Sequence, residues 1–317
     1  MSATPVAGPS QTKRRRRAVS PSEKQRRDVI EKVIEYILLA AAALSILITI
    51  GIVVTVVYES SGFFRTVPLK DFLFDVRWNP ISESNPRYGI LPLLSGTLMT
   101  TVVALFVALP MGTIIAIYLC EYADPTVREI IKPSLELLSA IPTVVYGYFA
   151  VLIIAPLMQF LITDLPGQNI LCAGIVMGIM IIPYVSSLSE DAMRAVPMLL
   201  REGSYALGAN RLTTALKVVY PSALSGIAAA YILGISRAIG ETMIVAIAAG
   251  MQAKLTFNPT DQAQTMTAFI VQLSQGDAEQ GSMAYQSIFA VGLSLFLMTL
   301  MFNLIGFYLR HRYREAY

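Results

Sequence analysis

Residues 201–226 read REGSYALGANRLTTALKVVYPSALSG and lie between two long apolar stretches of the chain. Six of these residues are spaced to fall on successive turns of a short helix: Arg201, Glu202, Tyr205, Ala206, Ala209 and Leu212. Gly208 then permits a break in the backbone, and a second helical piece is predicted over 213–219. Pro221 stands near the start of the next apolar stretch, where proline is tolerated. The segment is either a helical knob that docks in a partner's groove or a helix that only links its neighbours.

The composition around this segment is that of a membrane protein. Of 317 residues, 55% are hydrophobic and only 14% are charged, whereas about 25% of a soluble domain is charged. About 20 helical residues are needed to cross roughly 30 Å of hydrocarbon. Six stretches are long enough: 36–58, 88–120, 137–163, 165–189, 218–253 and 280–309. We therefore expect an all-α integral membrane protein with six transmembrane helices.

The distribution of basic residues orients these helices. Eighteen of the 24 Lys and Arg residues lie in the two terminal tails and in the segments 119–132 and 190–217, and five lie in the alternate loops. Loops rich in Lys and Arg stay on the cytoplasmic side of a membrane. Both termini are therefore predicted to be cytoplasmic, and the chain is predicted to be a multi-pass protein of the cell membrane.

Five regions follow along the chain. They are a basic, disordered cytoplasmic tail over 1–33, a first transmembrane helix over 34–58, an extracytoplasmic loop over 59–89, a core of five transmembrane helices over 90–310, and a cytoplasmic tail over 311–317. The core includes a cytoplasmic loop at 190–221 and an outer loop at 254–280. The basic run KRRRR in the first tail is better explained by topology and anionic membrane lipid than by nucleic acid.

The outer loop contains its own helical pattern. Met266, Phe269, Ile270 and Leu273 are spaced as one apolar face of a short amphipathic helix. Such a helix commonly lies on the membrane surface. The alternative is a cap over the outer end of a transport pathway.

Arg237 and Glu241 place charge inside the fifth apolar stretch. At 1.5 Å per residue, Arg237 would lie about 20–25 Å from the end near Ser222, and a charge at that depth costs about 2.5–3.5 kcal/mol on insertion scales. In one continuous helix the two residues share a face. They are then either an ion pair that fixes packing, or a site where Arg237 binds an oxyanion while Glu241 weakens that binding enough for release.

Tyr146 is a further candidate for the pathway. It follows Pro142, which is expected to kink the third span. Tyr146 either shapes the pathway or packs beside that kink.

The sequence contains no catalytic or cofactor motif. No G-x-x-x-x-G-K-[ST] phosphate-binding loop is present. His311 is the single histidine, so no Ser–His–Asp triad or histidine-based metal site can form. We therefore expect no catalytic residue, no metal site and no cofactor in this chain, which is not expected to be an enzyme.

The cytoplasmic loop resembles the motif E-A-A-x-x-x-G-x9-I-x-L-P of bacterial ABC-importer permeases. Glu202, Gly203 and Ser204 stand at its first three positions and Gly208 at its glycine, and nine residues later the chain reads VVYP, ending at Pro221. Gly and Ser replace the two alanines, and Val and Tyr replace Ile and Leu. The resemblance implies the type I permease fold. It also implies that Glu202, Gly203, Ser204, Ala206, Gly208, Ala209 and Pro221 form the coupling helix that fits a cleft on an ATPase subunit.

Three further stretches narrow the resemblance to phosphate importers. LPLLSGTLMTT (91–101), IPTVVYG (141–147) and SRAIGET (236–242) are similar to their permease subunits, and the N-terminal region favours the PstC type. This resemblance implies import of inorganic phosphate by alternating access, through a pathway that includes Arg237, Glu241 and Tyr146. The implied partners are a second permease of the PstA type, two ATPase subunits that bind ATP and Mg, and an extracytoplasmic phosphate-binding protein in a bacterial inner membrane. A permease for sulfate or molybdate and an ATP-independent carrier remain alternatives.

Overall fold

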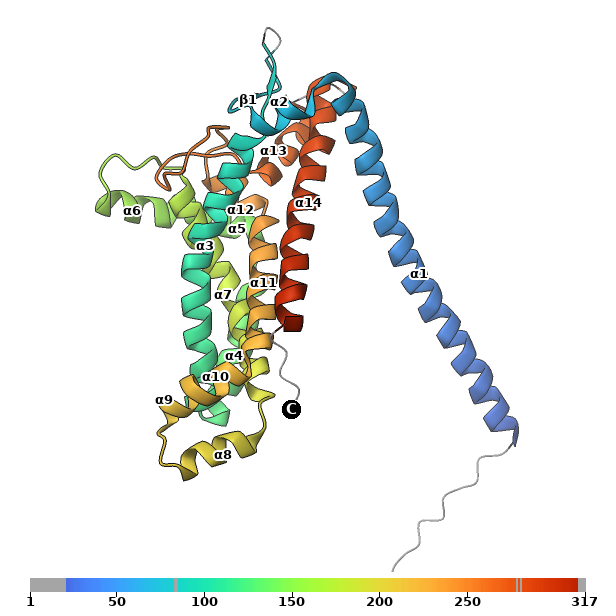
Figure 1. Ribbon diagram of the computed structural model, residues 1–317, viewed down its shortest axis with the longest axis vertical. Coiled ribbons are helices and arrows are strands. Elements are labelled where there is room, and N and C mark those ends of the chain that lie inside the picture. The colour runs from blue at the N-terminus through green and yellow to red at the C-terminus, as the bar shows by residue number, and fades with distance from the viewer. Residues whose placement is uncertain (1–20, 83–84, 278, 280, 313–317) are drawn as a thin grey trace, which may run out of the picture. The chain divides into compact units, whose positions relative to one another are not determined.

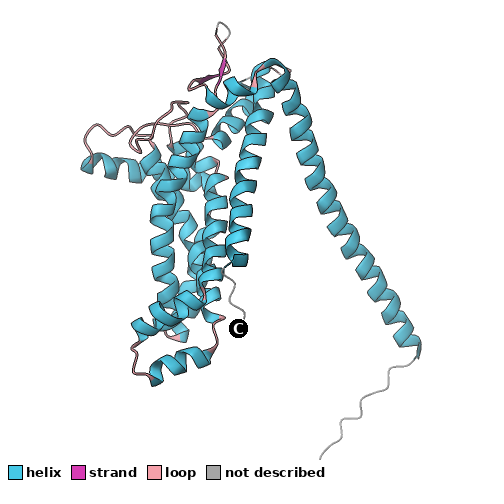
Figure 2. Cartoon of the chain, in the orientation of Figure 1, coloured by secondary structure: helices cyan, strands magenta, loops and turns pink. Residues whose placement is uncertain are grey.

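The computed structural model describes residues 21–82, 85–277, 279 and 281–312, and these are mostly helical (Figures 1 and 2). The chain forms two compact units, residues 1–55 and 56–317. Among the described residues, five helical segments are long and apolar enough to cross a membrane, or six if the bent segment 211–239 counts as one span. The predicted all-helical membrane fold is therefore confirmed.

The first unit consists of most of helix α1 (Pro21–Thr66). Its apolar side chains between 36 and 54 are exposed around the helix, which suits lipid rather than water. The expected disorder over 1–33 is wrong for residues 21–33, which are helical, while residues 1–20 lie outside the described part. Once the apolar span has formed a helix, each added residue gains a hydrogen bond without a new nucleus, and Pro21 at the first position has a preorganised φ.

The second unit is organised around α7 (Ile170–Arg194), which is the most buried of the long helices. It packs against α3 (Leu91–Ile117) and α11 (Leu224–Ile239), and α11 also packs against α14 (Met283–Arg312). Gly174 and Gly178 allow α3 to approach closely, because a Cβ at Gly178 would lie 2.7 Å from the carbonyl oxygen of Ala104. Small residues four apart are a common device for packing helices in lipid.

The third and fifth predicted spans are interrupted. Helix α4 (Pro125–Ser139) ends before Pro142, and α5 (Thr143–Phe149) begins after it. The predicted kink within one helix is therefore wrong at Pro142, because proline disfavours helical backbone in the residue before it. Beyond α5, the span continues through a π-helical turn and a last short helix, bounded as follows: Ala150–Ile154 and α6 (Ala155–Leu161).

The stretch 218–253 is likewise not one helix. A cytoplasmic part, Arg211–Ser222, is bent by 74° from α11. Helix α11 ends at Ile239, and α12 (Met243–Ala248) begins after a break that starts at Gly240. Glycine weakens a helix interior, and the residues of the break find other hydrogen-bond partners, as described below.

The outer end of the second unit has a buried aromatic cluster. Short elements around it are α2 (Leu69–Phe74), β1 (Trp78–Asn79), β2 (Arg87–Tyr88) and α13 (Met266–Gln272), with Trp78 opposite Tyr88 in the antiparallel pair. Phe269 of α13 lies edge-on to Trp78, with ring centroids 4.8 Å apart. Helix α13 is therefore packed inside the protein, and its expected place on the membrane surface is wrong. Aromatic pairs add to area burial in holding it there.

The outer loop also completes the start of α7. The N–H groups of Ile170 and Leu171 donate to the carbonyl oxygens of Asp261 and Pro259, at 3.0 and 2.7 Å. The side chain of Asn169 accepts the N–H of Cys172 at 2.7 Å. First-turn N–H groups have no partner within a helix, so the loop and the Asn169 cap satisfy donors that would otherwise be buried.

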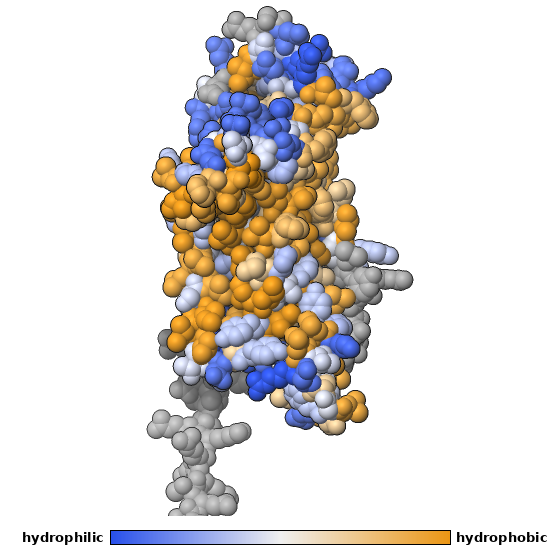
Figure 3. Space-filling view, turned by 90° about the vertical axis from the view of Figure 1, so that its left-hand side faces the viewer, coloured by the Kyte–Doolittle hydropathy of each residue, from blue (hydrophilic) through white to orange (hydrophobic). Residues whose placement is uncertain are grey.

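Five further elements gather at the opposite end, which the charge pattern assigns to the cytoplasm (Figure 1). They are the π-helical turn Tyr118–Tyr122, α8 (Met198–Ala206), α9 (Arg211–Thr214), the π-helical turn Ala215–Val219 and α10 (Tyr220–Ser222). On the face drawn in Figure 3, the middle of the surface is mostly hydrophobic and the two ends are mostly hydrophilic. This banding is expected of a protein whose middle contacts lipid.

The glycine contact between α7 and α3 can be tested directly. We expect Gly178→Ala to lower the thermal stability of the purified chain in detergent, because the new methyl group overlaps backbone of α3. Gly292→Ala in α14 is the matched control, because nothing lies within 4 Å of a Cβ there. An equal fall in melting temperature for both variants would contradict this packing, and so would an unchanged melting temperature for Gly178→Ala.

Candidate functional site

Arg237 lies in the last turn of α11, beside two residues of α7. Its guanidinium carbon is 4.2 Å from the centre of the Tyr184 ring, and one terminal nitrogen is 3.9 Å from the sulfur of Met180. Its Nε is buried and has no hydrogen-bond partner among the described residues. A cation over an aromatic ring is stabilised by the ring's quadrupole, but neither contact neutralises the charge.

Glu241 does not pair with Arg237. Its carboxylate accepts the N–H groups of Met243 and Ile244, at 3.1 and 3.3 Å, and so caps the start of α12. The residue is only 8% exposed, and its backbone carbonyl accepts the hydroxyl of Thr267 at 2.7 Å. The expected shared helix face is therefore wrong, because the break places the carboxylate at the next helix's N–H groups. Negative charge is favoured at such a helix start.

The consequence is an arginine without a counter-ion in the membrane region. Across the described residues, no carboxylate forms an ion pair with Arg237. Arg237 is half-buried and its Nε is buried, and charged groups removed from water are normally paired. The arrangement at Arg237 can therefore attract an anion, and the forked donors of guanidinium match an oxyanion geometrically.

Tyr146 lies on α5 and is buried. Its hydroxyl donates to the carbonyl oxygen of Leu138 at 2.8 Å, across the break at Pro142. Its side chain belongs to the same apolar cluster as Ala238 and Ile244, which flank the break after α11. The structure therefore uses the Tyr146 hydroxyl to join α4 to α5 and does not bring it into hydrogen-bond contact with Arg237.

The segment that resembles the permease motif, residues 198–222 and called the coupling segment after that motif, contains the predicted break. Gly208 has a φ of +83°, a conformation that glycine adopts without strain. The side chain of Asn210 then accepts the N–H of Thr213 and caps α9. The predicted second helical piece over 213–219 is confirmed as α9 and the π-helical turn that follows.

Ser204 explains one departure from the permease motif. Its hydroxyl is 2.9 Å from the hydroxyl of Thr214, and both residues are buried. This hydrogen bond joins α8 to α9, which an alanine at 204 would not do. Gly203, which replaces the other alanine of the motif, is exposed, and a Cβ there would meet nothing within 4 Å.

One side of α8 carries large apolar side chains that the described part of the chain leaves exposed. Leu199 is 78% exposed and Leu207 is 91% exposed. Glu202, Gly203 and Ala206 are exposed on the same segment. Large exposed apolar residues rimmed by polar ones mark interaction surfaces, so this side has the composition of a docking surface. Pro221 lies beyond it, in α10, where the chain turns toward α11.

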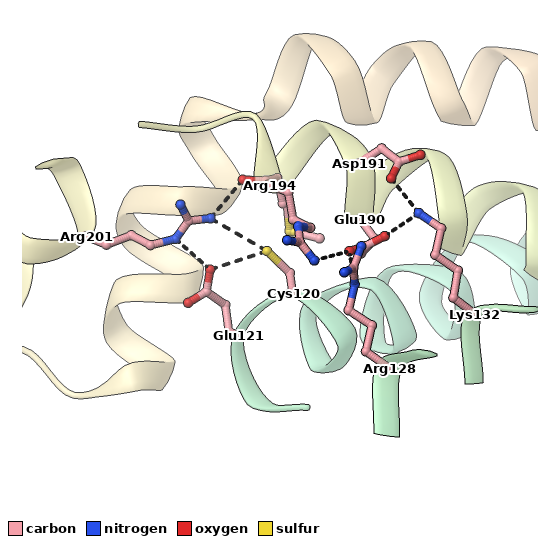
Figure 4. A network of polar contacts seen from close by, with 9 residues as sticks. Cys120, Glu121, Arg128, Lys132, Glu190, Asp191, Arg194 and Arg201 are labelled. Atoms are coloured by element: carbon pink, nitrogen blue, oxygen red, sulfur yellow. Dashed lines mark hydrogen bonds and ion pairs between the residues drawn. The ribbon is translucent and has the colours of Figure 1, made fainter. Parts of the chain in front are cut away.

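A buried carboxylate holds the cytoplasmic ends of α4 and α7 together (Figure 4). Glu190 of α7 is fully buried and pairs with Arg128 Nε at 2.8 Å and Lys132 Nζ at 2.7 Å, both from α4. Arg194 lies 3.6 Å from the same carboxylate, and Lys132 also contacts Asp191. Burial alone would lower the pKa of Lys132, but its hydrogen bonds to Asp191 and Glu190 prevail and raise that pKa.

A separate ion pair, between Arg201 and Glu121, holds the coupling segment against the end of α3. Arg201 of α8 pairs with Glu121 at 3.1 Å, in the π-helical turn after α3. Its terminal nitrogens donate to the carbonyl oxygens of Val196 and Met193, at 2.7 and 2.9 Å. Sequence reasoning missed this anchor, although an arginine on the inner face of a short helix of small residues was the available signal.

Comparison with known proteins agrees with this architecture. Residues 108–315 match the family described as binding-protein-dependent transport system inner membrane component. The chain belongs to this family. As a multi-pass member, it is an inner-membrane transport component.

Two relatives cover most of the chain. The probable ABC transporter permease protein YqgH of Bacillus subtilis is 37% identical, over 76% of this chain and 78% of YqgH. The phosphate transport system permease protein PstC of Mesorhizobium japonicum is 30% identical, over 86% of this chain and 88% of that protein.

Solved structures show the same fold at low sequence identity. A bacterial ABC transporter for import of the acidic polysaccharide alginate matches with a TM-score of 0.63 at 15% identity, over 92% of this chain and all of that chain. The inward-facing MetNI methionine ABC transporter matches with a TM-score of 0.53 at 16% identity, over 72% of this chain and 95% of that chain. The type I importer permease fold is therefore confirmed.

The two glycines of the coupling segment should respond oppositely to alanine. Gly203→Ala should raise thermal stability slightly, by about 0.5–1 kcal/mol, because alanine is the better helix former and the space is open. Gly208→Ala should lower it by about 1–2 kcal/mol, because alanine is strained at positive φ. Thermal unfolding of the two purified variants measures the difference. Equal shifts of the same sign would show that the break is not at Gly208.

The Glu190 network gives a second matched pair. Glu190→Gln should destabilise the purified chain by up to about 3 kcal/mol, because it leaves Arg128 and Lys132 without their buried counter-ion. Asp191→Asn should cost much less, because that carboxylate is 58% exposed. Thermal unfolding again provides the readout. A Glu190 variant as stable as the Asp191 variant would contradict the anchoring role.

Proposed function

We propose that this chain is the transmembrane permease subunit of an ATP-driven importer of inorganic phosphate. The observation that carries the proposal is Arg237, a membrane-region arginine without a carboxylate partner, whose donors are left for an oxyanion. Support for phosphate comes from relatives named phosphate transport permease, which are 30–34% identical over most of the chain.

The contacts of Arg237 suit an anion that binds and leaves. Tyr184 and Met180 hold the guanidinium by one ring face and one sulfur, so no strong hydrogen bond has to break when phosphate arrives. One arginine replaces part of the anion's hydration without trapping it, as passage requires. In this scheme Glu241 caps α12 and Tyr146 joins α4 to α5. Both residues shape the pathway by holding its helices in place and do not contact the anion.

ATP enters this scheme through other chains. We propose that two ATPase subunits, which hold ATP and Mg, dock on the exposed side of α8 around Leu199 and Leu207. Closure of those subunits would push the coupling segment and move α11 through the 74° bend that joins them. A second permease of the PstA type would complete the pathway, and an extracytoplasmic phosphate-binding protein would deliver the anion.

Uptake of radiolabelled phosphate tests the role of Arg237. In cells lacking other phosphate importers, Arg237→Gln should reduce uptake about 10- to 100-fold at equal membrane abundance, since hydrogen bonds to charged groups contribute about 1.5–3 kcal/mol. Arg237→Lys should keep part of the activity, because it retains the charge but not the forked donors. Excess sulfate and molybdate should not compete.

Three results would contradict the proposal. Normal uptake by Arg237→Gln would make the arginine a packing element. Effective competition by sulfate or molybdate would indicate a permease for that oxyanion instead. Phosphate uptake that follows an ion gradient, with no ATPase subunit co-purifying, would indicate a carrier that does not use ATP.

A further inference from the structure

A cleft of about 930 Å³ lies at the predicted cytoplasmic end, between the residues after α3 and the coupling segment. Four of its lining residues are arginines: Arg128, Arg194, Arg201 and Arg211. These come from four elements, namely α4, α7, α8 and α9. The cleft is separate from Arg237, which does not line it.

Three of these arginines retain unused donors toward the cleft. Arg211 forms no hydrogen bond or ion pair through its side chain with any described residue. The side chain of Arg194 is 48% exposed, and within the described part of the chain its one polar contact is the long 3.6 Å contact with Glu190. Arg128 pairs with Glu190 through Nε, so its two terminal nitrogens have no partner among the described residues.

The acidic residues of the cleft do not cancel this charge. Glu121 is one of two acidic lining residues, and its carboxylate is already paired with Arg201 and almost completely buried. Asp124, the other, is exposed, and its single charge is outnumbered by the three arginines with spare donors that line the same cleft. Glu190 does not line the cleft, and its charge is shared between Arg128 and Lys132. The cleft therefore keeps an excess of positive charge.

The cleft and the exposed apolar side of α8 are different surfaces. Met198, Arg201 and Tyr205 line the cleft, and their spacing places them on one face of the helix. Leu199 and Leu207, the most exposed apolar residues of this segment, are not among the lining residues. A partner seated on the leucines therefore leaves room for a small ligand on the arginines.

We propose that this cleft binds a phosphate group through Arg128, Arg194 and Arg211. Guanidinium groups from three elements, α4, α7 and α9, line the cleft, and a guanidinium group can bind phosphate oxygens bidentately. A bound phosphate would connect α9 to α4 and α7, and would thereby restrain the coupling segment. Two sources have this chemistry, free inorganic phosphate in the cytoplasm and the headgroup of an anionic lipid. The site does not depend on phosphate being the transported substrate.

Equilibrium binding of radiolabelled inorganic phosphate tests the site. The full chain carries Arg237→Gln, which removes the pathway arginine, and is reconstituted in nanodiscs of phosphatidylcholine alone. We expect Arg194→Gln/Arg211→Gln to weaken binding at least 10-fold and Arg211→Gln alone, which breaks no contact, about 3- to 10-fold. Arg77→Gln is the matched control, since it removes an exposed outer-loop arginine.

A second arm distinguishes the lipid source. Nanodiscs containing phosphatidylglycerol, without phosphate, should raise the melting temperature of the parent but not of the double variant if a headgroup occupies the cleft. Either a phosphate-binding difference or a lipid-dependent difference between parent and double variant supports the site and names its source. If both variants match the parent in both arms, the proposal is overturned, whatever Arg237 does in transport.

Discussion

The central constraint in this structure is that the break in the fifth span directs the Glu241 carboxylate to the start of α12 and not to Arg237. One oxygen of Glu241 accepts the N–H groups of Met243 and Ile244 and caps α12, and among the described residues the carboxylate forms no ion pair with Arg237, four residues earlier. The break in the fifth span creates both conditions together, because it ends α11 at Ile239 and exposes the start of α12. The membrane-spanning region thereby contains a cation, Arg237, whose contacts are the ring of Tyr184 and the thioether of Met180. The proposed binding of an oxyanion follows from that imbalance.

Helix α7 connects this cation to both ends of the molecule. Its start is completed by the Asn169 cap and by carbonyl groups of the outer loop. Its middle carries Tyr184 and Met180, which contact Arg237, and its cytoplasmic end carries Glu190. Because glycines let α3 pack closely on the same helix, a displacement at the coupling segment has a rigid element through which to act. This would be the physical basis of the proposed link between ATP-driven motion in other subunits and the Arg237 site.

The sequence predicted the class of fold, and it predicted the helical pieces and the break at Gly208 within residues 198–222. Long apolar stretches, the basic loops and the spacing from Glu202 to Pro221 are local patterns, and Gly208 marked a true change of backbone direction. Prediction from the sequence failed where contacts with distant residues determine the structure. A continuous helix through 218–253 was the expectation from composition, but a side-chain cap on α12 competes with continuation. The sequence of α13 shows an apolar face, which suggested an interfacial helix. It does not show that Trp78, nearly 200 residues earlier, packs against that face.

The measurement that tests the account most directly is a double-mutant cycle on phosphate uptake with Arg237→Gln and Glu241→Gln. If Glu241 caps α12 and does not pair with Arg237, the double variant should be at least as impaired as Arg237→Gln alone, because removing the carboxylate relieves no unpaired charge. Rescue of uptake in the double variant would show that the two charges neutralise each other in the working protein. That result would contradict the unpaired arginine on which the proposed pathway rests.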